Sequence, residues 1–222
     1  MDDARDIQDF AVECLDGRPI GYTLAATTRV TSRLLNCCEV VSGTLMDDFV
    51  YDSGAIVGLP YGALGIGAQF IFVIGSSLRE PYTAASVSNA IVSCRMGLQL
   101  LGRRASRGLP IDDWSATADF ALDVGCVRGA EIAGWDPADL GAIRVSLRVG
   151  GYEMARNDGP DVFGDPLGAL VDLARSLHAR GGSLEAGDVV ATGSCTGLTQ
   201  IVPGQHIAAI FPGHGEVEVN VT

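Results

Sequence analysis

The C-terminal third holds the stretch that decides the fold: Phe163–Leu170 reads FGDPLGAL, and Leu184–Ser194 reads LEAGDVVATGS. Between them, apolar residues recur with the period of an amphipathic helix. Asp165 is a preferred N-cap residue, Pro166 suits the first helical position, and Gly181-Gly182 suits the end. The pattern predicts a helix over 166–180, and its core-facing residues are Leu167, Leu170, Val171, Ala174 and Leu177.

Strands are predicted on both sides of this helix. Apolar and polar residues alternate over 143–149, the period of a strand with one buried face, and Gly150-Gly151 after it is a hairpin signal. Three more strands are expected over 188–193, 206–211 and 215–221.

The N-terminal half predicts a similar mixture. The apolar run over 68–78 indicates a central strand buried on both faces, and residues 83–101 indicate a helix over much of their length. Shorter strands are expected over 21–26 and 43–51, and a helical turn or two over 28–36. An amphipathic helix is expected over 2–15, with Ile7, Phe10, Ala11 and Cys14 on one face. Strands dominate, so the fold class is α+β (mixed α/β).

Composition limits what the chain can be. Its 222 residues, 47% hydrophobic and 19% charged, suit one globular domain over 1–222. A net charge of −12 repels phosphate backbones and anionic membrane surfaces, so neither nucleic acid nor a membrane is an expected partner. The apolar run over 68–75 is too short to cross a bilayer, and the acidic N-terminus MDDARD lacks the layout of a signal peptide. We therefore expect a cytoplasmic protein.

All fifteen basic residues are arginine. The absence of lysine excludes Schiff-base chemistry, a phosphate-loop lysine and a lysine general base. Three histidines are too few to favour a multi-histidine metal site. The six cysteines show no Cys-x-x-Cys spacing, which favours buried apolar residues over redox or nucleophilic groups.

The quoted C-terminal stretches, together with Val202-Pro203-Gly204, closely resemble the C-terminal part of the fumarylacetoacetate hydrolase / 2-keto-4-pentenoate hydratase (4-oxalocrotonate decarboxylase) family. Upstream, Gly17-Arg18-Pro19, Thr27-Thr28 and Phe72-Val73-Ile74-Gly75 continue the likeness. The resemblance implies a rolled, mixed β-sheet around a pocket, helices outside, and homo-oligomers. The helical part before Gly17, about residues 1–17, is shorter than is usual in the family.

The resemblance also implies a divalent cation, held by a Glu-x-Glu pair and a third carboxylate, which takes up charge on an enolate. Here the Glu-x-Glu positions read Gly67-Ala68-Gln69. The third carboxylate, in the family pattern Glu-Ile-Val-Asp-Ser-Arg, falls on Ala90 of Ala90–Arg95. The family lysine falls on Thr23, and a further acidic position falls on Val41. Because these positions lack ligands, we predict no catalytic metal and no other cofactor.

Several residues remain candidates for a site. Gln69, which replaces a metal ligand, is expected to hydrogen-bond a ligand carbonyl, and Arg95 to pair with a carboxylate. Asp123 and Asp119 are candidate general bases. Structural alternatives stay open for each: an amide satisfied by the backbone, an ion pair, or a turn residue. Candidate substrate contacts, for which capping and turn roles are the alternatives, are Thr27, Thr28, Gly67, Ala90, Thr192 and Ser194.

Three hypotheses about function follow. The first is a metal-independent enzyme of lyase, hydratase, isomerase or cyclase type, which acts on an enolisable, carbonyl-rich small molecule in a specialised-metabolite pathway. The second is a non-catalytic binder or a partner subunit of an active relative. The third is a metal enzyme with ligands from Asp47, Asp48 or Asp123. The small residues Gly65, Gly67, Ala68 and Ala90 suggest room for a bulky, less polar ligand and favour the first hypothesis.

Overall fold

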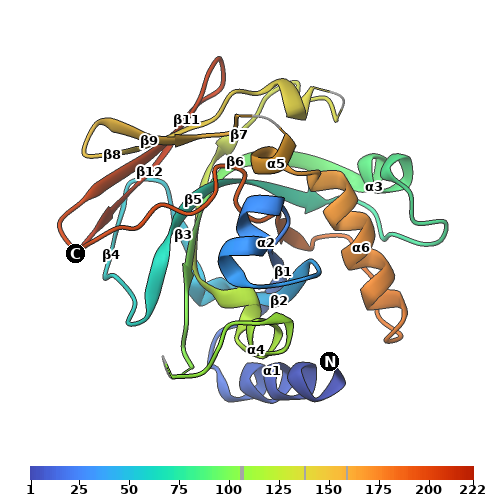
Figure 1. Ribbon diagram of the computed structural model, residues 1–222. Coiled ribbons are helices and arrows are strands. Elements are labelled where there is room, and N and C mark those ends of the chain that lie inside the picture. The colour runs from blue at the N-terminus through green and yellow to red at the C-terminus, as the bar shows by residue number, and fades with distance from the viewer. Residues whose placement is uncertain (106–107, 138, 159) are drawn as a thin grey trace.

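The computed structural model describes residues 1–105, 108–137, 139–158 and 160–222. Its strands form two sheets. The larger sheet has the order β2-β1-β10-β5-β6-β7-β3, and the smaller has the order β4-β12-β11-β8-β9. Figure 1 shows the smaller sheet at the upper left and the helices to its right and below. The mixture of packed sheets and outer helices confirms the α+β expectation.

The larger sheet is built around a long antiparallel hairpin-like pair, β5 (Ala63–Ile74) and β6 (Ile91–Gly102). Its remaining strands are β1 (Pro19–Ala25), β2 (Val41–Met46), β3 (Val50–Asp52), β7 (Asp123–Glu131) and β10 (Val189–Ala191). The smaller sheet consists of β4 (Ala55–Val57), β8 (Ser146–Val149), β9 (Tyr152–Arg156), β11 (His206–Phe211) and β12 (Gly215–Val221).

The two faces of β5 are buried against different partners. Phe70 and Phe72, on one face, belong to the main apolar core, which includes strands of the smaller sheet and the helix α6 (Pro166–His178). Gln69 and Ile71 point to the other face. Part of that face, around Leu101 of β6, is covered by α2 (Arg29–Leu35), α4 (Asp113–Ala118) and the short 3₁₀ segment η2 (Phe120–Leu122), which form a second core. Ile71 packs in a third cluster with Leu45, Cys126 and Ala191. Burial on both faces confirms β5 as a central strand.

The other helical elements lie at the periphery. They are α1 (Asp2–Cys14), α3 (Ala84–Ala90), α5 (Pro160–Phe163), η1 (Asp47–Phe49) and η3 (Leu140–Ala142). The helix α1 lies along the edge strand β2 and against α4. Among the described residues, no helix combines the length and the apolar character needed to cross a bilayer.

Three local expectations were wrong. Residues 83–101 form only the short helix α3, and the rest is β6, because pairing with β5 and β7 overrides local helical spacing. The strand expected over 43–51 is interrupted by η1. The face of α1 that carries Ile7, Phe10 and Cys14 points to solvent, with Phe10 68% exposed, while Ala4 and Gln8 face the protein. The helix α6 agrees with the prediction, and Asp165 caps it by accepting a hydrogen bond from the Gly168 N–H.

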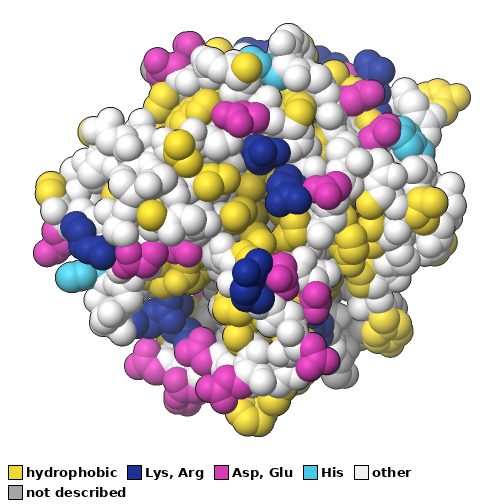
Figure 2. Space-filling view, turned by 180° about the vertical axis from the view of Figure 1, so that it is seen from behind, with side chains coloured by type: hydrophobic (Ala, Val, Ile, Leu, Met, Phe, Trp, Pro, Cys, Tyr) yellow, Lys and Arg dark blue, Asp and Glu magenta, His cyan; other side chains and the backbone are white. Residues whose placement is uncertain are grey.

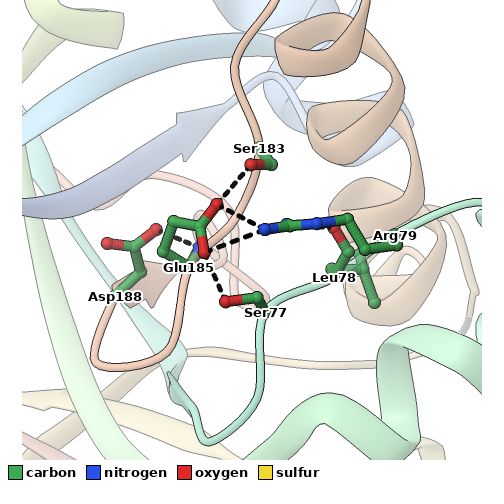
Figure 3. Close-up of polar contacts among 6 residues, drawn as sticks. All are labelled: Ser77, Leu78, Arg79, Ser183, Glu185 and Asp188. Atoms are coloured by element: carbon green, nitrogen blue, oxygen red, sulfur yellow. Dashed lines mark hydrogen bonds and ion pairs between the residues drawn. The ribbon is translucent and has the colours of Figure 1, made fainter.

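A polar network ties the start of β10 to the segment after β5, as Figure 3 shows. The Glu185 carboxylate accepts hydrogen bonds from the Ser77 and Ser183 hydroxyls and pairs with Arg79 at 3.1 Å. These donors lower the pKa of Glu185, the Ser183 hydroxyl most of all. Asp188 accepts a hydrogen bond from the Glu185 N–H and closes the turn. The Arg79 and Glu185 side chains are exposed, so the network holds the turn at the surface of the protein.

Candidate functional site

Five polar side chains meet on the helix-covered face of the larger sheet. They come from four strands and are here called the polar cluster: Thr23, Gln69, Gln99, Asp123 and Cys126. Strand register brings them together, because Gln99 of β6 pairs with Gly67 of β5 on one side and with Cys126 of β7 on the other. Each of the five is at most 1% exposed. No open pocket therefore reaches these side chains.

The amide nitrogens of the cluster are fully used. Gln99 Nε2 donates to Thr23 Oγ1 at 3.3 Å and to the Leu24 carbonyl at 2.9 Å. Gln69 Nε2 donates to the Leu98 carbonyl at 3.2 Å and to Cys126 Sγ at 3.4 Å. In contrast, Oε1 of both glutamines and both carboxylate oxygens of Asp123 accept no well-formed hydrogen bond among the described residues. A buried oxygen without a hydrogen-bond donor costs free energy, so protonation of Asp123 or the binding of a donor group would stabilise the cluster.

Burial raises the pKa of Asp123 to about 7. The guanidinium of Arg104 and the hydroxyl of Thr23 act in the opposite direction, but they do not overcome the loss of hydration. Burial, together with the nearby Asp123 carboxylate, also raises the pKa of the Cys126 thiol, which stays protonated. Asp123 is therefore the group of the cluster that exchanges a proton near neutral pH.

Arg104 is fixed beside the cluster by two kinds of contact. It pairs with Asp119 at 3.2 Å, and the N–H groups of Arg104 and Ala105 also donate to this carboxylate. Its guanidinium lies over the rings of Phe49, at 4.8 Å from the centroid, and Phe120, at 5.1 Å. Asp119 is thereby occupied by a structural ion pair, the alternative that the sequence left open.

The segment η2 covers Asp123 in an unusual backbone conformation. Phe120, Ala121 and Leu122 have φ values of 54°, 54° and 59°, the left-handed region, which costs about 1–2 kcal/mol per non-glycine residue. Their position explains Gly43 in β2, because a Cβ there would lie 2.3 Å from the Phe120 carbonyl carbon. Strain held directly against a buried acid is typical of functional sites.

The residues present do not fit a divalent cation held as the family resemblance implies. Gly67 offers no ligand, and the room for a side chain is taken: a Cβ there would lie 1.9 Å from Ser194 Oγ and 2.4 Å from the Gly197 carbonyl oxygen. Gln69 and Gln99 are neutral. The described residues contain no group of three or more His, Cys, Asp or Glu side chains suited to a metal ion. Hard cations favour anionic oxygen ligands, and Asp123 is the sole acid of the cluster.

Ala90, where the resemblance places the third carboxylate, lies away from the polar cluster. Ala90 ends α3, and its neighbour Ile91 pairs with Ile74, whereas Gln69 pairs with Gly97, about 20 Å further along β6 at about 3.3 Å per residue. Ala90 is therefore not part of the cluster. Gln99 lies diagonally across from Gln69, because Gln99 pairs with Gly67 and Gln69 pairs with Gly97. The Leu98-Gln99 step inside an apolar run was the signal that could have found it.

Arg95 is also outside the cluster. Its guanidinium donates to the Gly129 carbonyl at 3.1 Å, near the far end of β6. The candidate metal ligands Asp47 and Asp48 lie in η1, where Asp47 pairs with Arg18 at 3.6 Å. Neither approaches Asp123 as a ligand set would require.

The predicted hydroxyl contacts lie at turns near the same face; Thr28, Thr192 and Ser194 are buried, and Thr27 is half-buried. Thr28 caps α2 by accepting a hydrogen bond from the Thr31 N–H. Thr192 donates to the Phe70 carbonyl at 3.0 Å, and Ser194 donates to the Gly197 carbonyl. Thr27 packs against Gly193, where a Cβ would lie 2.6 Å from Thr27 Oγ1. These contacts give the hydroxyls structural roles, and their contact with a ligand stays a prediction.

The rolled sheet, the outer helices and the enclosed acid and amides define an α+β domain with a buried polar cluster. The chain belongs to the fumarylacetoacetate (FAA) hydrolase C-terminal family, whose model matches residues 47–222. This confirms the resemblance that the sequence predicted.

Individual relatives agree with this assignment. The chain is 26% identical over 229 residues to a 2-keto-4-pentenoate hydratase of Paraburkholderia xenovorans (strain LB400), which covers 98% of this chain and 82% of the relative. It is 25% identical over 214 residues to a 2-hydroxyhexa-2,4-dienoate hydratase of Comamonas testosteroni, covering 92% and 79%. Hydratase relatives support an enzyme built on this fold.

A solved structure has the same fold. The 4-oxalocrotonate decarboxylase from Pseudomonas putida G7, complexed with magnesium and adipate, superposes with a TM-score of 0.87 at 24% identity, covering 99% of this chain and 85% of that one. The 2-hydroxyhepta-2,4-diene-1,7-dioate isomerase from Mycobacterium marinum superposes with a TM-score of 0.66 at 18% identity, covering 93% and 76%. The fold is thus shared by proteins named for different reactions.

Proposed function

We propose that this protein is a metal-independent enzyme of lyase or isomerase type, including hydratase or cyclase chemistry, that acts on an enolisable, carbonyl-rich small molecule. We place it in a specialised-metabolite pathway, in the cytoplasm, as a homo-oligomer. The observation that carries the proposal is the unpaired, buried carboxyl of Asp123 beside the two neutral amides of Gln69 and Gln99. Proton transfer by Asp123 takes the role that the family resemblance assigns to a divalent cation.

The chemistry follows from the two forms of Asp123. Its pKa of about 7 leaves both the neutral acid and the carboxylate populated near neutral pH, the condition for efficient general acid–base catalysis. As a neutral acid, Asp123 donates to a substrate carbonyl oxygen while enolate character develops there. As a carboxylate, it removes a proton from the carbon next to that carbonyl. The Thr23 hydroxyl donates to the substrate oxygen from β1, and the free Oε1 atoms of Gln69 and Gln99 accept a hydrogen bond from the enol hydroxyl once it forms.

Access to the cluster requires movement of its cover. Gln69, Gln99 and Asp123 are enclosed, and the segments over them are η2 and the turn at 194–197. The left-handed backbone of η2 stores energy that a bound substrate releases when this segment shifts. Closure afterwards keeps water away from the enol intermediate.

The same enclosure favours a second candidate function, a non-catalytic partner subunit of an active relative. The filled space at Gly67 is what a collapsed pocket would show. A subunit kept for assembly needs the fold but no exchangeable proton at Asp123.

Deuterium exchange into the carbon next to the carbonyl of a simple 2-keto acid, followed by proton NMR, separates these possibilities. The proposal predicts exchange that survives EDTA, falls by about 10²–10⁴-fold in Asp123→Asn, and is retained in the matched surface variant Asp16→Asn. Loss of exchange with EDTA and recovery with Mg²⁺ would refute metal independence. Absence of exchange across a panel of 2-keto acids and 1,3-diketones would support the non-catalytic function.

A further inference from the structure

A cavity of about 190 Å³ lies on the opposite side of β1 from the polar cluster, between α1, β1–β2 and the end of α6. Tyr22 of β1 points into it, whereas the next residue, Thr23, points to the cluster. Basic and hydroxyl side chains dominate its polar lining, which includes Arg5, Gln8, Asp9, Tyr22, Ser42 and Arg180.

Two guanidinium groups are held together at this cavity. Arg5 Nη2 donates to the Ser176 hydroxyl at 3.1 Å, and Arg180 Nε donates to the Ser176 carbonyl at 3.3 Å. Within the described ranges, neither arginine forms an ion pair. Burial, and then repulsion from Arg180, lowers the pKa of Arg5, while the nearby carboxylates of Asp2 and Asp9 act in the opposite direction. The exposed Arg180 and the half-buried Arg5 repel each other, and an anionic group placed between them would attract both.

The remaining groups complete a donor-rich site. The Tyr22 hydroxyl and the Ser42 hydroxyl form no side-chain hydrogen bond with the described residues, and burial raises the pKa of Tyr22, so its phenol remains a donor. Gln8 is already committed to Thr44 and to the Thr117 carbonyl. Asp9 also lines the cavity, but it does not reach ion-pair distance of either arginine. Figure 2, the view from behind Figure 1, shows acidic side chains gathered along the lower edge of the molecule, at the level of α1.

The size of the cavity restricts its occupant. About 190 Å³ is less than the usual volume of a pocket for a drug-sized ligand, so a single phosphate or carboxylate group suits it. A neighbouring cavity of about 470 Å³ shares Arg5 and Ser42. Its lining includes the apolar side chains of Leu24, Val40 and Leu173 and, toward solvent, the carboxylates of Glu39 and Asp172. An apolar body attached to the anionic group has room there.

We propose that Arg5 and Arg180 form a binding site, separate from the polar cluster, for a small molecule with an anionic head group and a short apolar body. The net charge of −12 opposes capture of anions from a distance, so affinity depends on the short-range contacts of the two guanidiniums. Anion binding at this site does not depend on the proposed catalytic function of the polar cluster.

Titration calorimetry of the full-length chain with inorganic phosphate and, separately, with butyrate tests the proposal and distinguishes the two head groups. We expect binding of at least one anion, weakened on the order of tenfold in Arg5→Gln and in Arg180→Gln. Arg148→Gln, an exposed arginine of β8, removes the same charge elsewhere and should bind as the wild type does. Circular dichroism confirms that each variant is folded. Equal weakening in all three variants, or no binding of either anion to the wild type, would overturn the proposal.

Discussion

Replacement of Asp123 by asparagine is expected to stabilise the protein, and to do so more strongly as the pH rises. In the folded state burial holds the pKa of Asp123 at about 7, against 3.8 for an ordinary aspartate. The folded state therefore binds more protons than the unfolded state between these two values, and stability falls as the pH rises through this window. The full difference corresponds to about 4 kcal/mol above about pH 7. Asparagine resembles the neutral acid in shape and cannot ionise, so it escapes this penalty.

Urea unfolding followed by circular dichroism at a series of pH values measures the effect. The stability of Asp123→Asn relative to the wild type should increase by about 3 kcal/mol between about pH 5 and about pH 8. Asp16→Asn carries the same charge change at an exposed position and should show no such trend. Two results would refute the placement of Asp123 as a buried acid with a raised pKa. They are a stability difference between variant and wild type that does not change with pH, and a variant that becomes less stable than the wild type as the pH rises.

Three further perturbations test the surroundings of the cluster. Arg104→Ala leaves Asp119, which is 6% exposed, without its ion-pair partner, so we expect the free energy of unfolding in urea to fall by about 3 kcal/mol. Because the Arg104 guanidinium lowers the pKa of Asp123, its removal should also move the pH window of the Asp123 effect to higher pH. An unchanged window would contradict the electrostatic coupling between Arg104 and Asp123. Gly67→Ala should lower the melting temperature by about 5 °C or more, because the added Cβ would lie 1.9 Å from Ser194 Oγ. A melting temperature of the variant equal to that of the wild type would show that there is room for a side chain at this position. Glu185→Gln should lower the melting temperature slightly at neutral pH and leave it unchanged in acid. The Ser183 and Ser77 hydroxyls and Arg79 lower the pKa of Glu185, so they stabilise the folded protein only while the carboxylate is ionised. A lower melting temperature that persists in acid would indicate that the substitution disturbs packing instead.

Local sequence signals predicted those parts of the fold that depend on local interactions. The helix α6 begins after the Asp165 cap, and β11 and β12 have the predicted bounds, because caps and strict alternation are encoded within a few residues. The strand β6 was missed for the opposite reason. Its conformation is imposed by the partners β5 and β7, which lie far away in sequence.

The candidate site was predicted in part. Gln69 and Asp123 were identified, yet their partners Gln99 and Cys126 were not, because the pairing that aligns them is a property of strand register. The resemblance placed the third carboxylate position at Ala90, which lies outside the polar cluster. The apolar face of α1 was recognised, but its direction could not be: amphipathic spacing shows that one face differs from the other, and here Gln8 anchors the polar side to Thr44 and Thr117.

The carbon-13 NMR signal of the Asp123 carboxyl, assigned by its absence in Asp123→Asn, tests most directly whether the cluster works with a proton or with a metal ion. A proton-based site predicts that this carboxyl titrates near pH 7 and that excess Mg²⁺ leaves the titration unchanged. A carboxyl that is already ionised below about pH 5 on addition of Mg²⁺ would contradict it, because a bound cation displaces the proton from its ligand.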